Sequence, residues 1–271
     1  MEVVVSASAT GPTIHSHLFQ FYSRKSSVSF STPGKIKPGF SPSSPKSLTA
    51  TCSLPDETIA TTKVATSVTS LAIKKRAADL SPVLKGTSVF LVGMKSPVKT
   101  DLGKLLADTL RYYYFDSDSL VEEAAGGEYA AKLCRESDEF CAAETEVLKQ
   151  LSSMGRLVVS AGDGAVQNST NLALLRHGIS LWIDVPLDIV DRDQLPGSQP
   201  EVLDQLVAMS EDVRDGYATA DATISLQNVA INLGYDELDS VTTEDMALEV
   251  LKVIEKLTRT KKLMEAAARP F

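Results

Sequence analysis

The sequence predicts an α/β fold, in which a parallel sheet of about five strands is flanked by helices. From residue 87 onward, short apolar runs alternate with longer segments whose apolar residues recur at helical spacing. Strands that alternate with helices form parallel sheets covered on both faces, and their binding loops lie at the C-terminal ends of the strands. The 43% of hydrophobic and 23% of charged residues are typical of a globular domain.

Each element is predicted from its own pattern along the chain. The short apolar runs predict strands at residues 88–92, 112–115, 157–160, 179–185 and 222–226. The segments with helical period predict helices at residues 71–80, 99–110, 119–125, 139–153, 168–176, 201–217 and 243–258.

The first 52 residues differ in composition from the rest of the chain. They are rich in Ser, Thr and Pro, and they hold five basic residues against the single acid Glu2. A basic, Ser-rich and acid-poor leader without a continuous apolar segment is typical of an organelle transit peptide. Since it shows no strong amphipathic arginine helix, a chloroplast leader fits better than a mitochondrial one. The alternative is a disordered tail that the mature protein keeps.

The composition therefore predicts three parts and a location. Residues 1–52 are expected to be a chloroplast transit peptide, residues 53–70 a Thr- and Ser-rich linker, and residues 71–271 the folded domain. The mature protein is then expected in the chloroplast stroma.

Charge and cysteine content exclude several classes of partner. The whole chain carries a net charge of −8, and without the basic leader the remainder carries −12, which argues against nucleic acid. No apolar run approaches the roughly 18 residues of a transmembrane helix. The three cysteines form no C-x-x-C pair, so neither a disulfide scaffold nor a structural zinc site is expected.

The loop after the first predicted strand reads GMKSPVKT and has the frame G-x-x-x-x-G-K-[ST] of a phosphate-binding loop. Gly93, Lys99 and Thr100 stand where the frame requires them. Val98 stands where the second glycine belongs, with Pro97 before it. In a working loop the backbone N–H groups surround the phosphates, the lysine reaches the outer phosphates and the threonine holds magnesium.

Polar residues also follow the next predicted strands. Asp116 and Asp118 come after the second strand, and the turn Gly162-Asp163-Gly164 comes after the third. The two carboxylates fit a magnesium or substrate site. They fit equally well a turn and a helix cap, with Asp118 just before an apolar helix start.

Together these motifs resemble the shikimate kinase family, from about residue 89 to residue 257. The order GM-x4-KT, FDSDxLVE, a Phe140–Glu144 helix motif, GxGAV, WIDVPL and YxxAD is the order in that family. The resemblance implies the nucleoside-monophosphate-kinase-like P-loop fold, with ATP on the loop. It also implies that Asp116 assists magnesium and Asp118 contacts shikimate, that two arginines and a Gly-Gly-Gly turn hold the shikimate carboxylate and ring, and that a lid supplies another arginine.

Several residues that the family uses are replaced in this chain. Cys141 follows Phe140 where an arginine is expected, and Asp163 replaces the middle glycine of the turn. Val213 stands in place of the second substrate arginine, and Arg214 beside it is rotated by about 100° on a helix. The lid segment between residues 186 and 201 is short and lacks the R-P-L-L sequence.

These replacements have predictable costs. A β-branched Val98 in a glycine conformation costs about 1–3 kcal/mol, and Pro97 removes one N–H from the phosphate cradle. Each lost arginine removes a contact of about 2–5 kcal/mol. Asp163 places a carboxylate where the shikimate carboxylate docks, so repulsion replaces attraction.

The expected function follows from these losses. No catalytic residue is assigned. Gly93, Lys99 and Thr100 form a vestigial nucleotide site, Thr100 and Asp116 a vestigial magnesium site, and Asp118, Gly162 and Gly164 are remnants of the substrate site. No cofactor is required, only weak ATP and magnesium binding is expected, and shikimate binding is not.

Two functional classes remain open. The plant shikimate-kinase-like proteins resemble this chain, which implies a binding or regulatory role in chloroplast biogenesis through an unidentified chloroplast protein partner. The alternative is an active ATP-dependent kinase for a different small metabolite. A new substrate would explain Cys141, Asp163 and Val213, but it leaves the changes at Pro97 and Val98 without a reason, since ATP would be unchanged.

Overall fold

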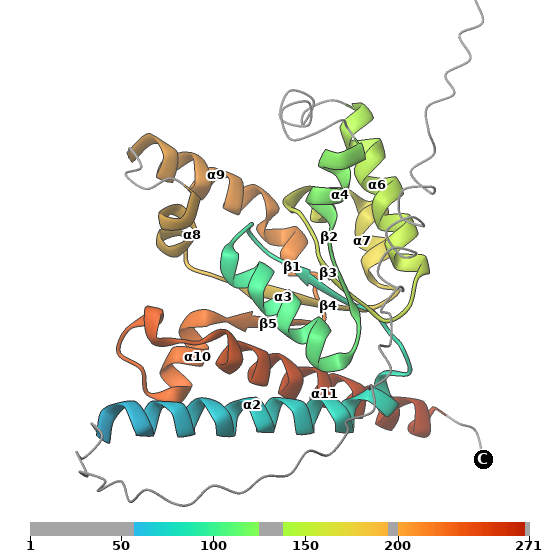
Figure 1. Cartoon of the computed structure of the whole chain (residues 1–271). Coiled ribbons are helices and arrows are strands. Elements are labelled where there is room, and N and C mark those ends of the chain that lie inside the picture. Colours follow the sequence, from blue (N-terminus) through green and yellow to red (C-terminus); the bar gives the residue numbers. More distant parts are fainter. Residues whose placement is uncertain (1–56, 125–137, 195–199, 269–271) are drawn as a thin grey trace, which may run out of the picture. The chain divides into compact units, whose positions relative to one another are not determined.

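Five parallel strands form one sheet in the order β2-β3-β1-β4-β5, which confirms the predicted fold class (Figure 1). The strands are β1 (Val89–Val92), β2 (Tyr113–Asp116), β3 (Leu157–Ser160), β4 (Ile179–Asp184) and β5 (Ala222–Ser225). The structure, a computed structural model, describes residues 57–124, 138–194 and 200–268. The expected transit peptide over residues 1–52 lies outside the described residues.

Helices fill the connections between the strands. They are α2 (Glu57–Leu84), α3 (Pro97–Leu110), α4 (Ser117–Ala124), α6 (Asp138–Ser153), α7 (Ser169–Leu175), α8 (Leu187–Gln194), α9 (Pro200–Tyr217), α10 (Leu226–Leu233) and α11 (Thr243–Ala267). Two short 3₁₀ helices are η1 (Asp163–Val166) and η2 (Leu238–Ser240). None of the helices in these described parts combines the length and apolar character that crossing a bilayer requires.

The strand order decides which helices share a face. Right-handed crossovers place α3 on one face of the sheet and the helices that follow β2 and β3 on the other. α11 lies against α3, and α6 lies against α7. The core between these layers is apolar: every residue of β1 and β3 is buried, and α3 and α11 contribute Leu102, Leu106, Val250 and Ile254.

A linker was expected over residues 53–70, with a helix from residue 71. The structure instead has residues 57–70 in helix α2, which begins at Glu57. Residues 57–70 contain many Thr and Ser but neither Gly nor Pro, so nothing stops the helix from extending. A compact unit runs from Val64 to Phe271. Within it, the helix buries a stripe of side chains at helical spacing, namely Ile73, Ala77, Leu80 and Leu84.

Two other helices were not predicted. α8 occupies the start of the segment interpreted as a shortened lid, and residues 195–199 after it lie outside the described residues. α10 begins directly at the end of β5 and stops at Gly234, which adopts φ +75°. Because strand and helix are contiguous there, the strand predicted at residues 222–226 ended on the first residue of α10, and the helix itself was not predicted.

Candidate functional site

The predicted site residues come together where β1, β2, β3 and β4 end. The loop after β1 starts at Gly93, whose φ of +133° suits glycine, and a Cβ there would overlap the Ile183 carbonyl. The loop ends where α3 begins: Ser96 caps the helix by accepting a hydrogen bond from the Lys99 N–H at 3.3 Å, and Pro97 is its first residue. The loop is therefore the N-terminus of a conventionally capped helix.

The strain expected at Val98 is not found. Val98 lies in the first turn of α3, and the non-glycine residues with positive φ in the described chain are Lys85, Arg111 and Arg156. Pro97 is also unstrained, because the first N–H of a helix has no partner within the helix. The expected energetic cost at Val98 was therefore wrong, although the missing Pro97 N–H still removes a donor from the phosphate cradle.

The Lys99 side chain points into the protein. It is only 3% exposed, and its ammonium donates hydrogen bonds to the Gly93 carbonyl and, over 2.8 Å, to the Ala161 carbonyl at the end of β3. Burial lowers the pKa of Lys99, while Asp163, Asp118 and Asp116 act in the opposite direction. In this position the lysine joins two strand ends, and reaching a phosphate would require it to leave both carbonyls.

Asp116, and not Asp118, caps the helix after β2. The Asp116 Oδ1 atom accepts a hydrogen bond from the Ser119 N–H over 3.1 Å. Asp118 lies inside α4, and burial foremost raises the pKa of its carboxyl, with Lys99 opposing this shift. The sequence had suggested Asp116 and Asp118 together as a turn and helix cap, and the structure places Asp118 as the second residue of the helix.

The fit of a magnesium ion rests on Thr100 and Asp116. Thr100 lies half-buried in the first turn of α3, and Asp116 ends β2. The described part of the chain holds no group of three or more His, Cys, Asp or Glu residues able to bind a metal by themselves. Magnesium at a nucleotide site uses one or two protein ligands together with phosphate oxygens. These two residues therefore fit an ion only if it arrives with a nucleotide.

The turn after β3 is fixed by close approaches. The Gly162 N–H donates to Ser117 Oγ over 3.0 Å, and a Cβ at Gly162 would overlap Asp118 Oδ1. A Cβ at Gly164 would overlap the buried Glu144 carboxylate. The turn is thus seated between α4 and α6, and its two glycines have a packing role whether or not a ligand binds.

Asp163 in the same turn is bound by α9. The Tyr217 hydroxyl donates to Asp163 Oδ1 over 2.8 Å, and burial together with this carboxylate raises the pKa of Tyr217. Tyr217 also stacks on Trp182 of β4, with ring centroids 5.8 Å apart. The Arg214 guanidinium lies 6.0 Å from the Trp182 ring centroid.

Cys141 and Val213, which stand where the two substrate arginines are expected, carry no positive charge. Val213 is buried at 5% exposure, and Cys141 is exposed. Arg214 is exposed, and its guanidinium lies over the Trp182 ring. A cavity of about 140 Å³ remains beside Arg214 and Tyr217, which is smaller than the roughly 300–1,000 Å³ of typical ligand sites.

Sequence reasoning missed the contacts among Tyr217, Asp163 and Trp182, and it missed the direction of Lys99. Tyr217 and Trp182 belong to motifs that the sequence displays, but their stacking depends on α9 lying across the end of β4. The segment interpreted as a lid lies largely within residues 191–206, whose side chains fall outside the described part of the structure. The expected loss of the lid arginine therefore stays a prediction from the sequence.

Comparisons with known proteins agree with this architecture. The shikimate kinase family model matches residues 97–206. The shikimate kinase from Acinetobacter baumannii in complex with shikimate shares the fold, with a TM-score of 0.54 and 22% identity over 66% of this chain and 97% of that one.

Curated relatives are more similar in sequence. "Probable inactive shikimate kinase like 1, chloroplastic" of Arabidopsis thaliana is 60% identical over 205 residues, which are 73% of each chain. "Shikimate kinase 3, chloroplastic" of Oryza sativa subsp. japonica is 36% identical over 210 residues, covering 72% of this chain and 73% of the relative. The chain therefore belongs to the shikimate kinase family.

Proposed function

We propose that this chain is a catalytically inactive shikimate-kinase-like protein with a non-enzymatic, binding or regulatory role in the chloroplast. The observation that carries the proposal is the Asp163 carboxylate, which stands in the substrate turn and is held there by Tyr217 at 2.8 Å. A shikimate carboxylate entering this turn would meet a like charge. The hydrogen bond keeps Asp163 in place, so the repulsion is built into the fold.

The nucleotide side supports the same conclusion. Lys99 is buried on two backbone carbonyls, and Pro97 offers no N–H to a phosphate. Gly93, Thr100 and Asp116 retain their places around the loop, so weak ATP and magnesium binding fits the site. No cofactor is required for the proposed role.

The transition state would also lack the two substrate arginines that Cys141 and Val213 replace. Each missing substrate arginine represents about 2–5 kcal/mol of binding, and an arginine over the transferring phosphate contributes roughly three to five decades in rate. A changed substrate would account for Cys141, Asp163 and Val213 alone. Pro97 favours an inactive protein over a kinase for another metabolite, because it removes an N–H from the phosphate loop and a changed substrate would leave ATP unchanged.

The relatives and the leader support the proposed cellular setting. Both the inactive relative and the rice kinase are named chloroplastic. The basic, acid-poor residues 1–52 support import into the chloroplast, with the stroma as the destination. A role in chloroplast biogenesis through a protein partner is the function we propose there.

The proposal is tested by measuring kinase activity and ligand binding on the same purified protein. Purified protein is assayed for shikimate phosphorylation against a Lys99→Ala variant, and ATP–magnesium and shikimate are titrated by calorimetry. We expect turnover indistinguishable from the variant, weak nucleotide binding and no shikimate binding. Turnover well above that of Lys99→Ala at physiological substrate concentrations would overturn the proposal.

A further inference from the structure

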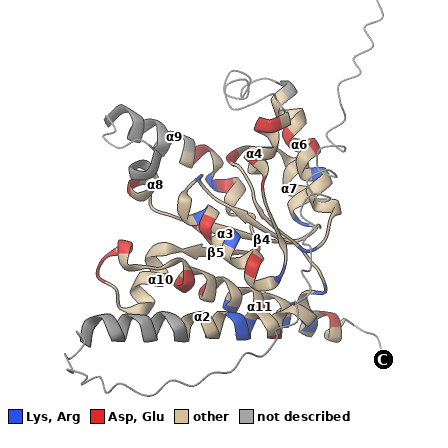
Figure 2. Cartoon of the chain, viewed as in Figure 1, with Lys and Arg blue, Asp and Glu red and all other residues tan. Residues whose placement is uncertain are grey.

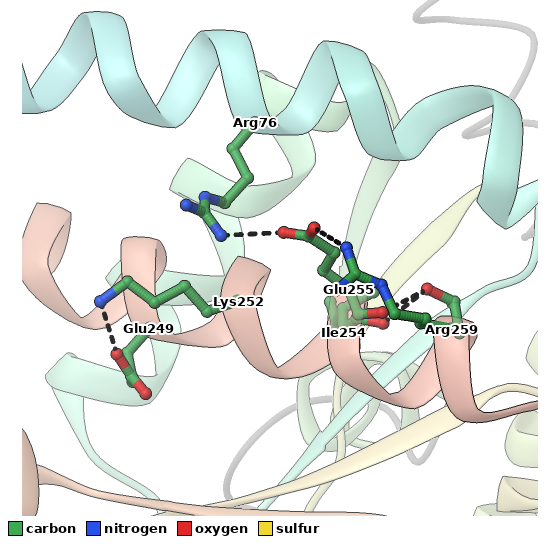
Figure 3. Close-up of polar contacts among 7 residues, drawn as sticks. Arg76, Glu249, Lys252, Ile254, Glu255 and Arg259 are labelled. Carbon is green, nitrogen blue, oxygen red and sulfur yellow. Dashed lines mark hydrogen bonds and ion pairs between the residues drawn. The ribbon is translucent and has the colours of Figure 1, made fainter.

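A groove of about 600 Å³ is lined by residues of α2 and α11, the two helices whose ion pairs Figure 3 shows. Both helices lie outside residues 97–206, the part that the shikimate kinase model matches. None of the predicted site residues lines this groove.

The groove is elongated along both helices. On α2 its lining residues recur at helical spacing on one face, namely Ala72, Lys75, Arg76, Asp79, Leu80 and Val83. This stretch is about 16 Å long, and the lining of α11 from Leu248 to Lys262 is about 21 Å long at 1.5 Å per residue. Such a groove has the length of a helix of three to four turns.

The floor of the groove is apolar and its rim is basic. Leu80, Val83 and Leu248 are buried or half-buried and line it together with Ala72. Four basic residues, Lys75, Arg76, Arg259 and Lys262, face two acidic ones, Asp79 and Glu255. The groove thus has an excess of positive charge on a chain whose net charge is −8.

Glu255, the acidic residue that α11 contributes to the groove, already forms two ion pairs. Glu255 Oε2 pairs with Arg76 Nη1 at 2.9 Å, and its Oε1 pairs with Arg259 Nη2 at 3.0 Å, so one carboxylate holds two guanidinium groups (Figure 3). Lys75 and Lys262 are exposed and make no ion pair within the part of the chain that the structure describes. Figure 2 shows basic residues on both helices. The rim therefore offers uncompensated cations to an acidic partner.

We propose that this groove binds an acidic amphipathic helix of a protein partner. Apolar side chains of the partner would lie on Leu80, Val83 and Leu248, and flanking Glu or Asp residues would meet Lys75 and Lys262. The inference rests on the proposed non-enzymatic role and places its binding surface at the helix pair instead of the former active site. The chain's own residues 1–52 carry a net positive charge, so they are not the occupant.

The test uses a defined probe and matched variants of the full chain. The probe is a fluorescein-labelled helical peptide of about 15 residues, with leucine at i, i+4, i+7 and i+11 and glutamate on the flanks. Its control has lysine in place of every glutamate. Binding is measured by fluorescence anisotropy with wild type, with Lys75→Glu/Lys262→Glu, and with Lys74→Glu/Lys261→Glu, which makes the same charge change at neighbouring exposed positions that do not line the groove.

We expect the acidic peptide to bind wild type and the Lys74/Lys261 variant alike, and to bind the Lys75/Lys262 variant about tenfold or more weakly. Added salt should weaken the binding. Equal binding to both variants, or equal binding of the lysine peptide, would refute the groove as the site.

Two further measurements decide between occupants. A concentration-dependent dimer of wild type that Lys75→Glu/Lys262→Glu abolishes would replace the partner helix with a second copy of the chain. Binding to vesicles of anionic lipid, lost in the same variant and without peptide binding, would replace it with a membrane surface. The kinase assay is independent of these results, so a failed groove leaves the inactive-kinase proposal standing, and kinase activity would refute that proposal whatever the peptide does.

Discussion

The Tyr217 hydroxyl donates a hydrogen bond to Asp163 Oδ1 over 2.8 Å, and this contact joins α9 to the turn after β3. Tyr217 is 2% exposed and stacks on Trp182, so the donor is held in position from two sides. Through this contact the turn holds the end of α9 whether or not a ligand binds there.

The first prediction concerns this hydrogen bond. Tyr217→Phe should lower the free energy of unfolding by about 1–3 kcal/mol, because it removes a donor to a half-buried carboxylate. Chemical denaturation of wild type, Tyr217→Phe, Asp163→Asn and the double variant measures the coupling between the two side chains. Additive effects of the two single changes would mean that the contact contributes nothing of its own.

The second prediction concerns Asp118 and pH. Burial raises the pKa of its carboxyl in the folded state, so the fold favours the protonated acid. The contribution of this group to stability is therefore largest at low pH, and it decreases as the pH rises from the unfolded value of 3.8 through the raised folded value. Asp118→Asn should raise the free energy of unfolding at pH 7 and flatten its pH dependence.

The control for that prediction is Asp108→Asn, which changes an exposed carboxyl on α3. Denaturant unfolding between pH 4 and 8 compares the two variants. If Asp118→Asn destabilises the protein at pH 7, attraction to Lys99 outweighs the cost of burying the carboxylate.

The third prediction concerns processing of the leader. Composition changes near Cys52, so the mature protein should begin close to that residue. Mass spectrometry of protein from isolated chloroplasts identifies the N-terminus directly. An intact Met1 there would contradict a cleaved transit peptide and favour a tail that the mature protein keeps.

The central strands β1 and β3 could be predicted because fully buried parallel strands are continuous apolar runs. The run at residues 157–160 is β3 as found, and the other four strands differ from their predicted ranges only at the ends. The prediction from composition was wrong at the start of α2. Thr and Ser made residues 57–70 look like a linker, yet their helix continues into a segment that buries Ile73 and Ala77.

Site geometry was less predictable, because it depends on contacts between distant residues. Lys99 reaches the Ala161 carbonyl, and Tyr217 reaches Asp163, across separations that no local pattern encodes. Val98 shows a second cause of error. The motif frame suggested a glycine conformation there, but Ser96 and Pro97 begin the helix early, and Val98 becomes an ordinary helical residue.

The fourth prediction concerns restoring nucleotide binding. Val98→Gly alone should restore neither turnover nor much ATP affinity, because Val98 is unstrained and Lys99 stays on its two carbonyls. Replacing Pro97 and Val98 together by glycine should gain more, since it returns one N–H to the loop while Gly93 and Thr100 are already in place. Calorimetric ATP affinity and turnover are measured for each variant. Robust turnover from Val98→Gly alone would show that the substrate site was intact all along.

The last prediction extends this repair to the substrate side. Asp163→Gly removes the repelling carboxylate and one of the charges that hold Lys99 inward, so shikimate affinity should rise together with ATP affinity. Cys141→Arg should add to shikimate binding, because Cys141 is exposed and an arginine there remains hydrated until the ligand arrives.

Val213→Arg should instead lower the thermal midpoint, because Val213 is 5% exposed and a buried guanidinium without a partner is costly. Measuring unfolding beside affinity separates this loss of stability from a failure to bind. Rate should remain low in every variant, because binding shikimate does not supply a cation over the transferring phosphate.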